Sequence, residues 1–253
     1  TRELVEKAEK CQIIARVGVG LDNIDQDAAK EKNIKVINAV EGAITAVAEL
    51  VIGLMLSMAR EIPRADREIR NGNWIKKELM GSELKGKYLG IVGLGNIGKR
   101  LGRLARALNM NIIGYDVTPI DDEFSKEVGL MKADLDTLLS SADYVSFHVP
   151  LLDSTRHMIN AEKLKMMKNT ARIINTARGG VIDEEALYNS LKEGSLAGAA
   201  LDVFEVEPAT GNKIITLPNF IATPHMGAQT KEAQLLAANI IAEKIIQILR
   251  GVL

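Results

Sequence analysis

The stretch Tyr88–Leu108, YLGIVGLGNIGKRLGRLARAL, decides the fold of this chain. It begins with an apolar run, Tyr88–Val92, typical of a buried strand. Six residues, Gly93–Gly98 (GLGNIG), separate this run from the helical pattern of Gly98–Leu108. The spacing Gly-x-Gly-x-x-Gly between a strand and a helix predicts a turn that binds the pyrophosphate of a dinucleotide.

Each glycine of this turn has its own physical reason. Gly93 permits the tight turn, Gly95 lets the phosphates approach the backbone, and Gly98 lets the helix pack closely on the strand. The helix N-terminus that follows supplies free N–H groups and a positive potential, both of which favour the phosphates.

Asp116 predicts which dinucleotide is bound. It ends the next apolar run, Asn111–Tyr115, and lies 18 residues after Gly98, where a carboxylate can accept hydrogen bonds from the adenosine ribose. A 2′-phosphate beside this carboxylate would be repelled, and Val117–Pro119 contains no arginine to receive it. We therefore expect NAD rather than NADP.

The rest of the chain repeats the alternation of apolar runs and helical patterns. Further strands are predicted at Tyr144–His148, Arg172–Asn175, Ala197–Val203 and Phe220–Ala222, and further helices at Leu135–Ser140, Ala161–Met167 and Glu184–Glu193. Continuous apolar strands joined by helices indicate an α/β fold, in which a doubly wound parallel sheet is covered on both faces. This is the Rossmann type of nucleotide-binding domain.

The two ends of the chain predict a second, smaller domain. Short helices at Thr1–Lys10 and Asp25–Lys32 alternate with strands at Gln12–Val17 and Lys35–Asn38. Longer helices follow at Ala43–Arg60 and Arg64–Asn71, and the final helix, Lys231–Arg250, can return to the N-terminal part. We expect residues 1–40 to form part of a substrate domain, 41–226 the NAD-binding domain, and 227–253 a helix that rejoins the substrate domain.

Composition excludes several other classes of protein. The chain has 253 residues and a formal net charge of −1 without a basic stripe, which argues against nucleic acid as a partner. Its one cysteine cannot form an internal disulfide and suits the cytoplasm, and one cysteine with three histidines argues against a metal site. The most apolar stretch, Leu50–Ala59, is about half the length of a membrane span, which predicts a buried helix.

Parallel strands deliver their carboxyl ends to one edge of the sheet, where ligands bind. The residues that follow the predicted strands are therefore expected to line the active site: the glycine turn, His148-Val149-Pro150, Thr176-Ala177-Arg178, Asp202–Pro208 and Thr223–Gly227.

A dehydrogenase that acts on an alcohol needs a base, and histidine is the usual one. We expect His157 to be structural, and His148 to be structural or to line the cofactor, because it lies early in the sheet. His225, in a restricted turn after Thr-Pro, is the predicted base. A carboxylate on its other ring nitrogen would fix the tautomer, and spacing leaves Glu205 and Glu207 equally possible.

Arg178 stands between an apolar strand and Gly-Gly, a position that suits recognition of a substrate carboxylate.

At this point the sequence resembles the D-isomer-specific 2-hydroxyacid dehydrogenases. The matching segments span nearly the whole chain: ARVGVGLDNID (Ala15–Asp25), VAELVIGLMLSMAR (Val47–Arg60), GSELKGKYLGIVGLGNIGKRL (Gly81–Leu101), IIGYD (Ile112–Asp116), HVPLLDSTRHMI (His148–Ile159), INTARGGVIDEEAL (Ile174–Leu187), LAGAALDVFEVEP (Leu196–Pro208) and ATPHMGAQTKEAQ (Ala222–Gln234). The resemblance implies a flavodoxin-like substrate domain beside the NAD-binding domain. Members of the family carry further residues before the first one here, so we expect this domain to be N-terminally incomplete.

The resemblance also implies roles for individual residues. The family's catalytic Arg, Glu and His fall on Arg178, Glu207 and His225, which favours Glu207 over Glu205. Its cofactor contacts, taken with the strand ends above, fall on Gly93, Gly95, Asn96, Ile97, Gly98, Asp116, Val149, Pro150, Thr176, Ala177, Arg178, Asp202, His225, Gly227 and Ala228. Its substrate contacts fall on Arg178, His225 and the loop of Val17, Gly18, Val19 and Gly20, whose N–H groups form an anion nest.

Arg16 points to a substrate within the family. It resembles the form of this loop in the phosphoglycerate-oxidising branch and can meet a phosphate, so we expect oxidation of 3-phospho-D-glycerate to 3-phosphohydroxypyruvate, a step toward serine. Reduction of glyoxylate or hydroxypyruvate is the alternative enzyme activity. An NAD-sensing corepressor of the same fold is the alternative from another class. Ala43–Arg60 and the Trp74 loop resemble the family's dimerisation region, so we expect a homodimer or a dimer of dimers.

Overall fold

The computed structural model describes residues 1–21 and 23–252, which form two compact units. The first unit combines Thr1–Val47 with Gly227–Leu253, and the second consists of Ala48–Met226. Each unit has its own core, and each is described by itself below.

The second unit is built on a seven-stranded sheet whose strands all run parallel, in the order β5-β4-β3-β6-β7-β8-β9. The reversal of strand order on either side of β3 confirms the predicted doubly wound sheet of the Rossmann type. The strands are β3 (Tyr88–Val92), β4 (Asn111–Tyr115), β5 (Leu130–Lys132), β6 (Tyr144–Phe147), β7 (Arg172–Asn175), β8 (Gly198–Leu201) and β9 (Phe220–Ala222).

Helices cover both faces of this sheet, because neighbouring strand residues point to opposite sides. Ile173 belongs to the cluster of apolar side chains under α7 (Leu135–Ser141), α8 (Ala161–Met166) and α9 (Glu184–Lys192), together with η1 (Lys213–Thr216). Its neighbour Ile174 belongs to the cluster under α3 (Val40–Ala59), α5 (Asn96–Ala107) and α6 (Asp122–Val128). Burial on both faces explains why these strands are continuous apolar runs.

Helix α3 is long and apolar enough to cross a membrane by length and composition alone. More than half of its most apolar part is buried inside the protein, and Ala48, Val51 and Met55 pack against the sheet. This packing is that of a core helix. It begins at Val40, three residues before the predicted start, and α4 (Ile62–Arg70) follows it after a short break.

Two short elements between β4 and β6 have no counterpart in the sequence prediction: α6 and β5. Helix α6 is one seven-residue segment whose buried side chains are Phe124 and Val128, and β5 is three residues long. Elements this short carry too few apolar positions to show a period. The predicted strand Ala197–Val203 is also shorter in the structure, where β8 ends at Leu201.

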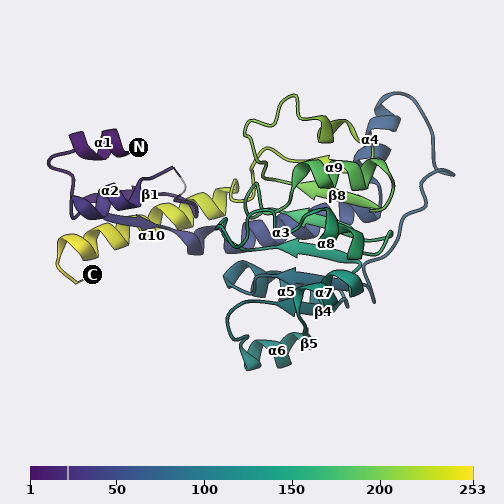
Figure 1. The fold of residues 1–253 in the computed structure, drawn as a ribbon, viewed down its shortest axis with the longest axis horizontal. Coiled ribbons are helices and arrows are strands. Elements are labelled where there is room, and N and C mark those ends of the chain that lie inside the picture. The colour runs from purple at the N-terminus through teal and green to yellow at the C-terminus, as the bar shows by residue number, and fades with distance from the viewer. Residues whose placement is uncertain (22, 253) are drawn as a thin grey trace. The chain divides into compact units, whose positions relative to one another are not determined.

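The first unit pairs β1 (Ile13–Arg16) with β2 (Lys35–Asn38) as parallel strands. Helices α1 (Arg2–Lys7) and α2 (Gln26–Glu31) share a small core around Val5 and Ile34. The last helix, α10 (Lys231–Leu249), lies beside β1 and β2 (Figure 1). Lys244 of α10 donates to the carbonyl oxygen of Asn38 at 2.9 Å, so the two ends of the chain share this unit.

Candidate active site

The glycine turn between β3 and α5 has no room for a side chain at two of its three glycines. Gly93 has a φ of 94°, and a Cβ there would lie 2.6 Å from the carbonyl oxygen of His148. A Cβ on Gly98 would lie 2.1 Å from the carbonyl oxygen of Gly93. At Gly95, by contrast, no other part of the chain that the structure describes comes within 4 Å of the Cβ position. Two glycines thus shape the turn, and the middle one leaves an open face to a ligand.

Helix α5 begins at this turn without a side-chain cap. Its N-cap residue is Gly95, whereas α6, α7, α8 and α9 each begin with an Asp or Asn side chain that accepts a backbone N–H. The first N–H groups of a helix have no partner within it, and with the helix dipole they favour an anion. Asn96 and Ile97 lie in this first turn. The residues present therefore fit the pyrophosphate of a dinucleotide.

Asp116 follows β4 and is bonded to the glycine turn itself. One carboxylate oxygen accepts the N–H of Leu94 at 2.6 Å, and the other accepts the N–H and the hydroxyl of Thr118, each at 2.8 Å. Burial opposes ionisation of Asp116, but the N–H groups of Thr118 and Leu94 outweigh it and hold its pKa below the ordinary value. Asp116 is a firmly ionised acceptor, as the predicted contact with the ribose hydroxyls requires.

The ends of β6 and β7 place further predicted cofactor contacts at the same edge of the sheet. Val149 and Pro150 follow β6, and the Val149 side chain comes within 3.0 Å of the Cβ position of Gly93. Thr176 and Ala177 follow β7. In the part of the chain that the structure describes, the buried Thr176 hydroxyl has no hydrogen-bond partner. A polar group of a bound cofactor can satisfy such a hydroxyl, which adds to the fit.

Arg178 lies in a loop that is held in place by the buried side chain of Asn175. The Asn175 amide donates to the carbonyl oxygen of Arg178 at 2.8 Å, and its oxygen accepts the N–H of Ala177 at 3.0 Å. The next residue, Gly179, lies against the chain that follows β8, since a Cβ there would be 1.9 Å from the carbonyl oxygen of Phe204. The Arg178 loop and the Phe204 loop are therefore packed backbone to backbone.

Asp202 holds the turn that carries His225. This carboxylate, 1% exposed, accepts the Thr223 hydroxyl at 2.6 Å and the N–H of Met226 at 2.9 Å, so it bonds to both sides of His225. His225 has a φ of 52°, in the left-handed region. Asp202 was predicted as a cofactor contact from the resemblance, and its part in holding this turn was missed by the sequence reasoning.

His225 and Glu207 are joined by a hydrogen bond. Nδ1 of His225 lies 2.8 Å from Oε2 of Glu207, and Oε1 of Glu207 accepts the N–H of Phe204 at 3.1 Å. An ionised carboxylate can only accept, so Nδ1 carries the hydrogen and Nε2 has the free lone pair. The imidazole is half exposed and lies on the wall of a cavity of about 540 Å³. The pair presents a basic nitrogen at the carboxyl edge of the sheet.

The other two histidines have different partners. The ring of His157 lies 3.0 Å from Oε1 of Glu205, so each of the two candidate glutamates bonds a different histidine. Nε2 of His148 lies 2.9 Å from the buried hydroxyl of Ser146, and burial lowers the pKa of His148 to about 4. Of the three histidines, His225 is the one bonded to Glu207.

The remaining predicted contacts belong to the first unit. Val17, Gly18, Val19 and Gly20 follow β1, and the Asn38 amide donates to the carbonyl oxygen of Val19 at 2.7 Å. Gly18 has a φ of 153°, which favours glycine there. Arg16, at the end of β1, is exposed. Gly227 and Ala228 precede α10, and the carbonyl oxygen of Ala228 accepts the side chain of Gln234.

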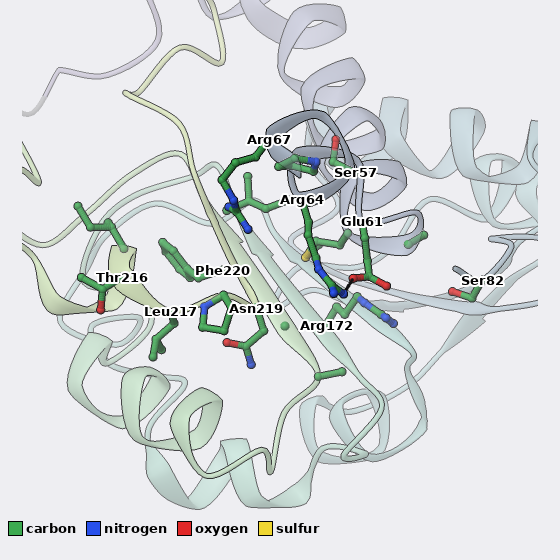
Figure 2. A pocket seen from close by; sticks show the side chains of 18 of the residues that line it. Ser57, Glu61, Arg64, Arg67, Ser82, Arg172, Thr216, Leu217, Asn219 and Phe220 are labelled. Carbon is green, nitrogen blue, oxygen red and sulfur yellow. Dashed lines mark hydrogen bonds and ion pairs between the residues drawn. The ribbon is translucent and has the colours of Figure 1, made fainter. Parts of the chain in front are cut away.

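A second cavity, of about 690 Å³, lies at the opposite edge of the sheet, where β7 and β8 begin (Figure 2). Arg64, Arg67 and Arg172 line it. Their charges are already engaged: Arg64 bonds Glu61 at 2.9 Å, Arg67 lies 3.7 Å from a carboxylate oxygen of Glu68, and Arg172 lies over the ring of Tyr144. This cavity is remote from the edge that carries the glycine turn.

Comparison with known proteins identifies the family. Residues 52–227 match the model of the D-isomer specific 2-hydroxyacid dehydrogenase, NAD binding domain. The chain therefore belongs to the D-isomer specific 2-hydroxyacid dehydrogenase family. Because the matched model is that of an NAD-binding domain, it also confirms the cofactor predicted from Asp116.

Individual relatives differ in how much of their length the chain covers. It is 50% identical over 99% of its residues to the D-3-phosphoglycerate dehydrogenase of Methanocaldococcus jannaschii, of which it covers 48%. It is 48% identical over 97% of its residues to the hydroxypyruvate reductase of Thermotoga maritima, of which it covers 80%. The chain thus spans about half the length of the D-3-phosphoglycerate dehydrogenases that it matches.

Solved structures agree with this assignment. The glyoxylate reductase of Paecilomyes thermophila is 35% identical with a TM-score of 0.90, covering 97% of this chain and 75% of that one. The D-lactate dehydrogenase of Aquifex aeolicus, solved with NAD and lactic acid, is 32% identical with a TM-score of 0.88, covering 100% of this chain and 80% of that one.

Proposed function

We propose that this chain oxidises a D-2-hydroxy acid with NAD. The observation that carries the proposal is the His225–Glu207 pair, which presents a basic ring nitrogen at the same sheet edge as the glycine turn. Arg178, Glu207 and His225 follow β7, β8 and β9, which are consecutive neighbours in the sheet. Family membership supports the assignment.

His225 is the base of the proposed reaction. Its Nε2 accepts the proton of the substrate's C2 hydroxyl while the C2–H bond breaks and the carbonyl forms. The charge of Glu207 then stabilises the imidazolium, and its bond to Nδ1 keeps Nε2 aimed outward. Bound NAD supplies the acceptor for the hydride that leaves C2.

Arg178 orients the substrate. Its planar guanidinium can bond both oxygens of the substrate carboxylate, and Asn175 and Gly179 fix the loop from which it projects. The developing C2 oxygen lies beside that carboxylate in any 2-hydroxy acid. The same cation therefore stabilises the negative charge that develops on the C2 oxygen as its proton is removed.

We propose 3-phospho-D-glycerate as the substrate, with 3-phosphohydroxypyruvate as the product on the way to serine. Arg16 supports a phosphorylated substrate because it is a cation exposed at the end of β1. The names of several relatives, from 42 to 50% identical to this chain, support the same choice.

Reduction of hydroxypyruvate is the second candidate. The Thermotoga maritima hydroxypyruvate reductase, at 48% identity, is covered over 80% of its length, a larger share than in the D-3-phosphoglycerate dehydrogenases. This reaction runs in the reverse direction with the same residues. His225, paired with Glu207, then donates the proton, and Arg178 holds the substrate carboxylate. The reaction has no need of a cation for phosphate.

A substrate panel separates the two candidates. NADH formation would be measured with phosphorylated and unphosphorylated D-2-hydroxy acids, and NADH consumption with hydroxypyruvate and glyoxylate, using the full-length protein. Arg16→Ala is expected to raise the KM for 3-phospho-D-glycerate roughly tenfold and to leave that for unphosphorylated acids unchanged. Equal effects on both kinds of substrate would remove the phosphate role, and Arg67→Ala, at the opposite edge of the second unit, is the matched control.

We also propose a homodimer in the cytoplasm. Trp74 and Met80, in the segment after α4, are 81% and 88% exposed, which is unusual for large apolar side chains and supports an interface there. Light scattering after gel filtration measures the mass, and a monomer would contradict the dimer.

A further inference from the structure

A second histidine–glutamate pair includes a residue of the loop that carries Glu207. The pair consists of His157, in the segment after β6, and Glu205, in the loop after β8. Glu205 also accepts a hydrogen bond from Glu184, the first residue of α9. The proposed reaction uses none of these three residues. All of them belong to the second unit.

Glu184 and Glu205 hold each other reciprocally. The N–H of Glu184 donates to Oε1 of Glu205 at 3.1 Å, and the N–H of Glu205 donates to Oε1 of Glu184. The other oxygen of Glu184 accepts the amide of Asn212 at 2.7 Å. Each carboxylate therefore fixes the backbone of the other segment, in the manner of a capping box formed between two distant stretches of chain.

His157 adds a third attachment from another strand end. Its own N–H donates to the carbonyl oxygen of Gly180 at 2.7 Å, and its backbone takes a φ of 49°, which aims the ring at Glu205. The carboxylates of Glu184 and Glu205 repel each other, so a hydrogen bond from the ring of His157 to Glu205 stabilises the pair. Burial, and then the negative charges of Glu205 and Glu207, raise the pKa of Glu184, as expected where carboxylates lie close together.

The attachment leads directly to the catalytic edge. Glu205 follows Phe204, whose N–H bonds Oε1 of Glu207 while Oε2 of Glu207 bonds His225. We propose that Glu205, held by His157 and Glu184, is a positioning residue that fixes the Phe204–Glu207 turn and through it the tautomer and direction of His225. This inference rests on the proposed function, in which His225 is the base.

Nuclear magnetic resonance of the histidine rings tests the inference without any substrate. The chain has three histidines, so the ¹⁵N ring signals are assignable from single substitutions. In the wild type, His225 should show the form with hydrogen on Nδ1. In Glu205→Ala it should become a mixture of both tautomers, whereas Glu205→Gln, which keeps the acceptor oxygen, should restore the wild-type signal.

Two further variants guard against simple loss of folding. His157→Ala removes one attachment and should give a smaller change of the same kind if Glu205→Ala is too unstable to study. Glu185→Ala, next to Glu184 on α9, breaks an exposed ion pair with Lys213 that does not reach the loop, and it is the matched control. It should leave the His225 signals unchanged.

Kinetics give the second readout. Glu205→Ala should lower kcat about tenfold with little change in the KM for NAD, because the base is misaimed while the glycine turn is untouched. An unchanged His225 tautomer in Glu205→Ala, or a Glu205→Gln variant as defective as Glu205→Ala, would overturn the inference. If the wild type oxidises none of the acids, the proposed function fails, and the ring signals still decide whether Glu205 positions His225.

Discussion

At the scale of single residues, His225 is held in a conformation that its own backbone does not favour. A φ of 52° costs a side chain with a Cβ about 1 kcal/mol. Asp202 offsets this cost by bonding Thr223 and Met226 on the two sides of the histidine. The turn is therefore selected by a buried carboxylate, and the ring is delivered to Glu207 with little freedom to leave it.

Replacing His225 tests its part as the base. His225→Gln is expected to keep its affinity for NAD, because the glycine turn and Asp116 are unaffected, and to lose roughly 100- to 10,000-fold in kcat. NAD affinity from fluorescence titration and kcat from NADH formation are the two measurements. A variant that turns over at near the wild-type rate would remove His225 from the proposed role.

Replacing Glu207 tests the pairing. The charge of Glu207 stabilises the imidazolium that forms when His225 takes the substrate's proton, so Glu207→Gln should lower kcat roughly 10- to 100-fold. NAD affinity should stay unchanged, because the glycine turn and Asp116 are unaffected. Steady-state NADH formation and NAD titration measure the two quantities. The control is Glu205→Gln, which should keep the wild-type kcat. A Glu207→Gln variant with the wild-type kcat would contradict the pairing.

At the scale of elements, the glycine turn separates folding from binding. Gly98→Ala places a Cβ 2.1 Å from the carbonyl oxygen of Gly93, so α5 must shift away from β3. Gly95→Ala meets no atom of another described segment within 4 Å, and it fills the space through which the pyrophosphate approaches.

We expect Gly98→Ala to lower the melting temperature, and Gly95→Ala to leave it unchanged while weakening NAD binding. Gly53→Ala in α3, which also meets nothing, is the control and should stabilise the fold by about 0.5–1 kcal/mol. Calorimetry and NAD titration read the two effects separately. A Gly95→Ala variant with wild-type NAD affinity would place the pyrophosphate elsewhere.

The sequence predicts the long buried elements of the second unit well because their apolar runs are continuous. Strands β3, β4, β7 and β9 have the predicted bounds. Helix α6 and strand β5 were missed, since a seven-residue helix with two buried side chains leaves no periodic signal. Sequence spacing also left Glu205 and Glu207 equal, because the direction of each side chain depends on a partner far away in the chain. Glu207 bonds His225, whereas Glu205 bonds Glu184 and His157. The roles assigned to the site residues stay predictions.

Asn175 shows what sequence reasoning could have found. It is 2% exposed, directly before the Arg178 loop, and both ends of its amide bond to that loop. An amide or carboxylate at the last position of an apolar strand is a recognisable signal, because a buried polar group needs partners and the nearest backbone is the following turn. Asp202, directly after β8, is used differently, because it bonds Thr223 and Met226 in the turn that follows the neighbouring strand β9.

At the scale of the whole molecule, the stability of the second unit depends on pH through one partly buried ring, that of His148. Burial lowers the pKa of His148 to about 4, from 6.5. The unfolded chain therefore binds a proton more readily than the folded one, and the unit loses stability as the pH falls from 6.5 toward 4, with no effect above that range. At pH 5 this amounts to about 2 kcal/mol relative to pH 7.

His148→Gln removes this contribution and can keep the bond to Ser146. The unfolding free energy from urea titration should depend less on pH in the variant, by about 2 kcal/mol between pH 7 and pH 5. His157→Gln, at a more exposed site, is the control. Equal pH dependence in His148→Gln and wild type would mean that the ring charges as readily in the folded protein as in the unfolded chain.

Strand β9 affects how the protein loses activity in denaturant. It is three residues long and leads straight into the turn that presents His225. Among the described strands it pairs with β8 alone, at the edge of the sheet. Edge segments open by local fluctuation at a lower free energy than the centre of a sheet. Fraying of this edge would separate His225 from Glu207 while the central strands keep their protection from hydrogen exchange. Turnover should therefore be lost at a lower denaturant concentration than the circular dichroism signal of the folded protein. Hydrogen exchange should also be faster at the backbone N–H of Ile221 than at that of Ile173.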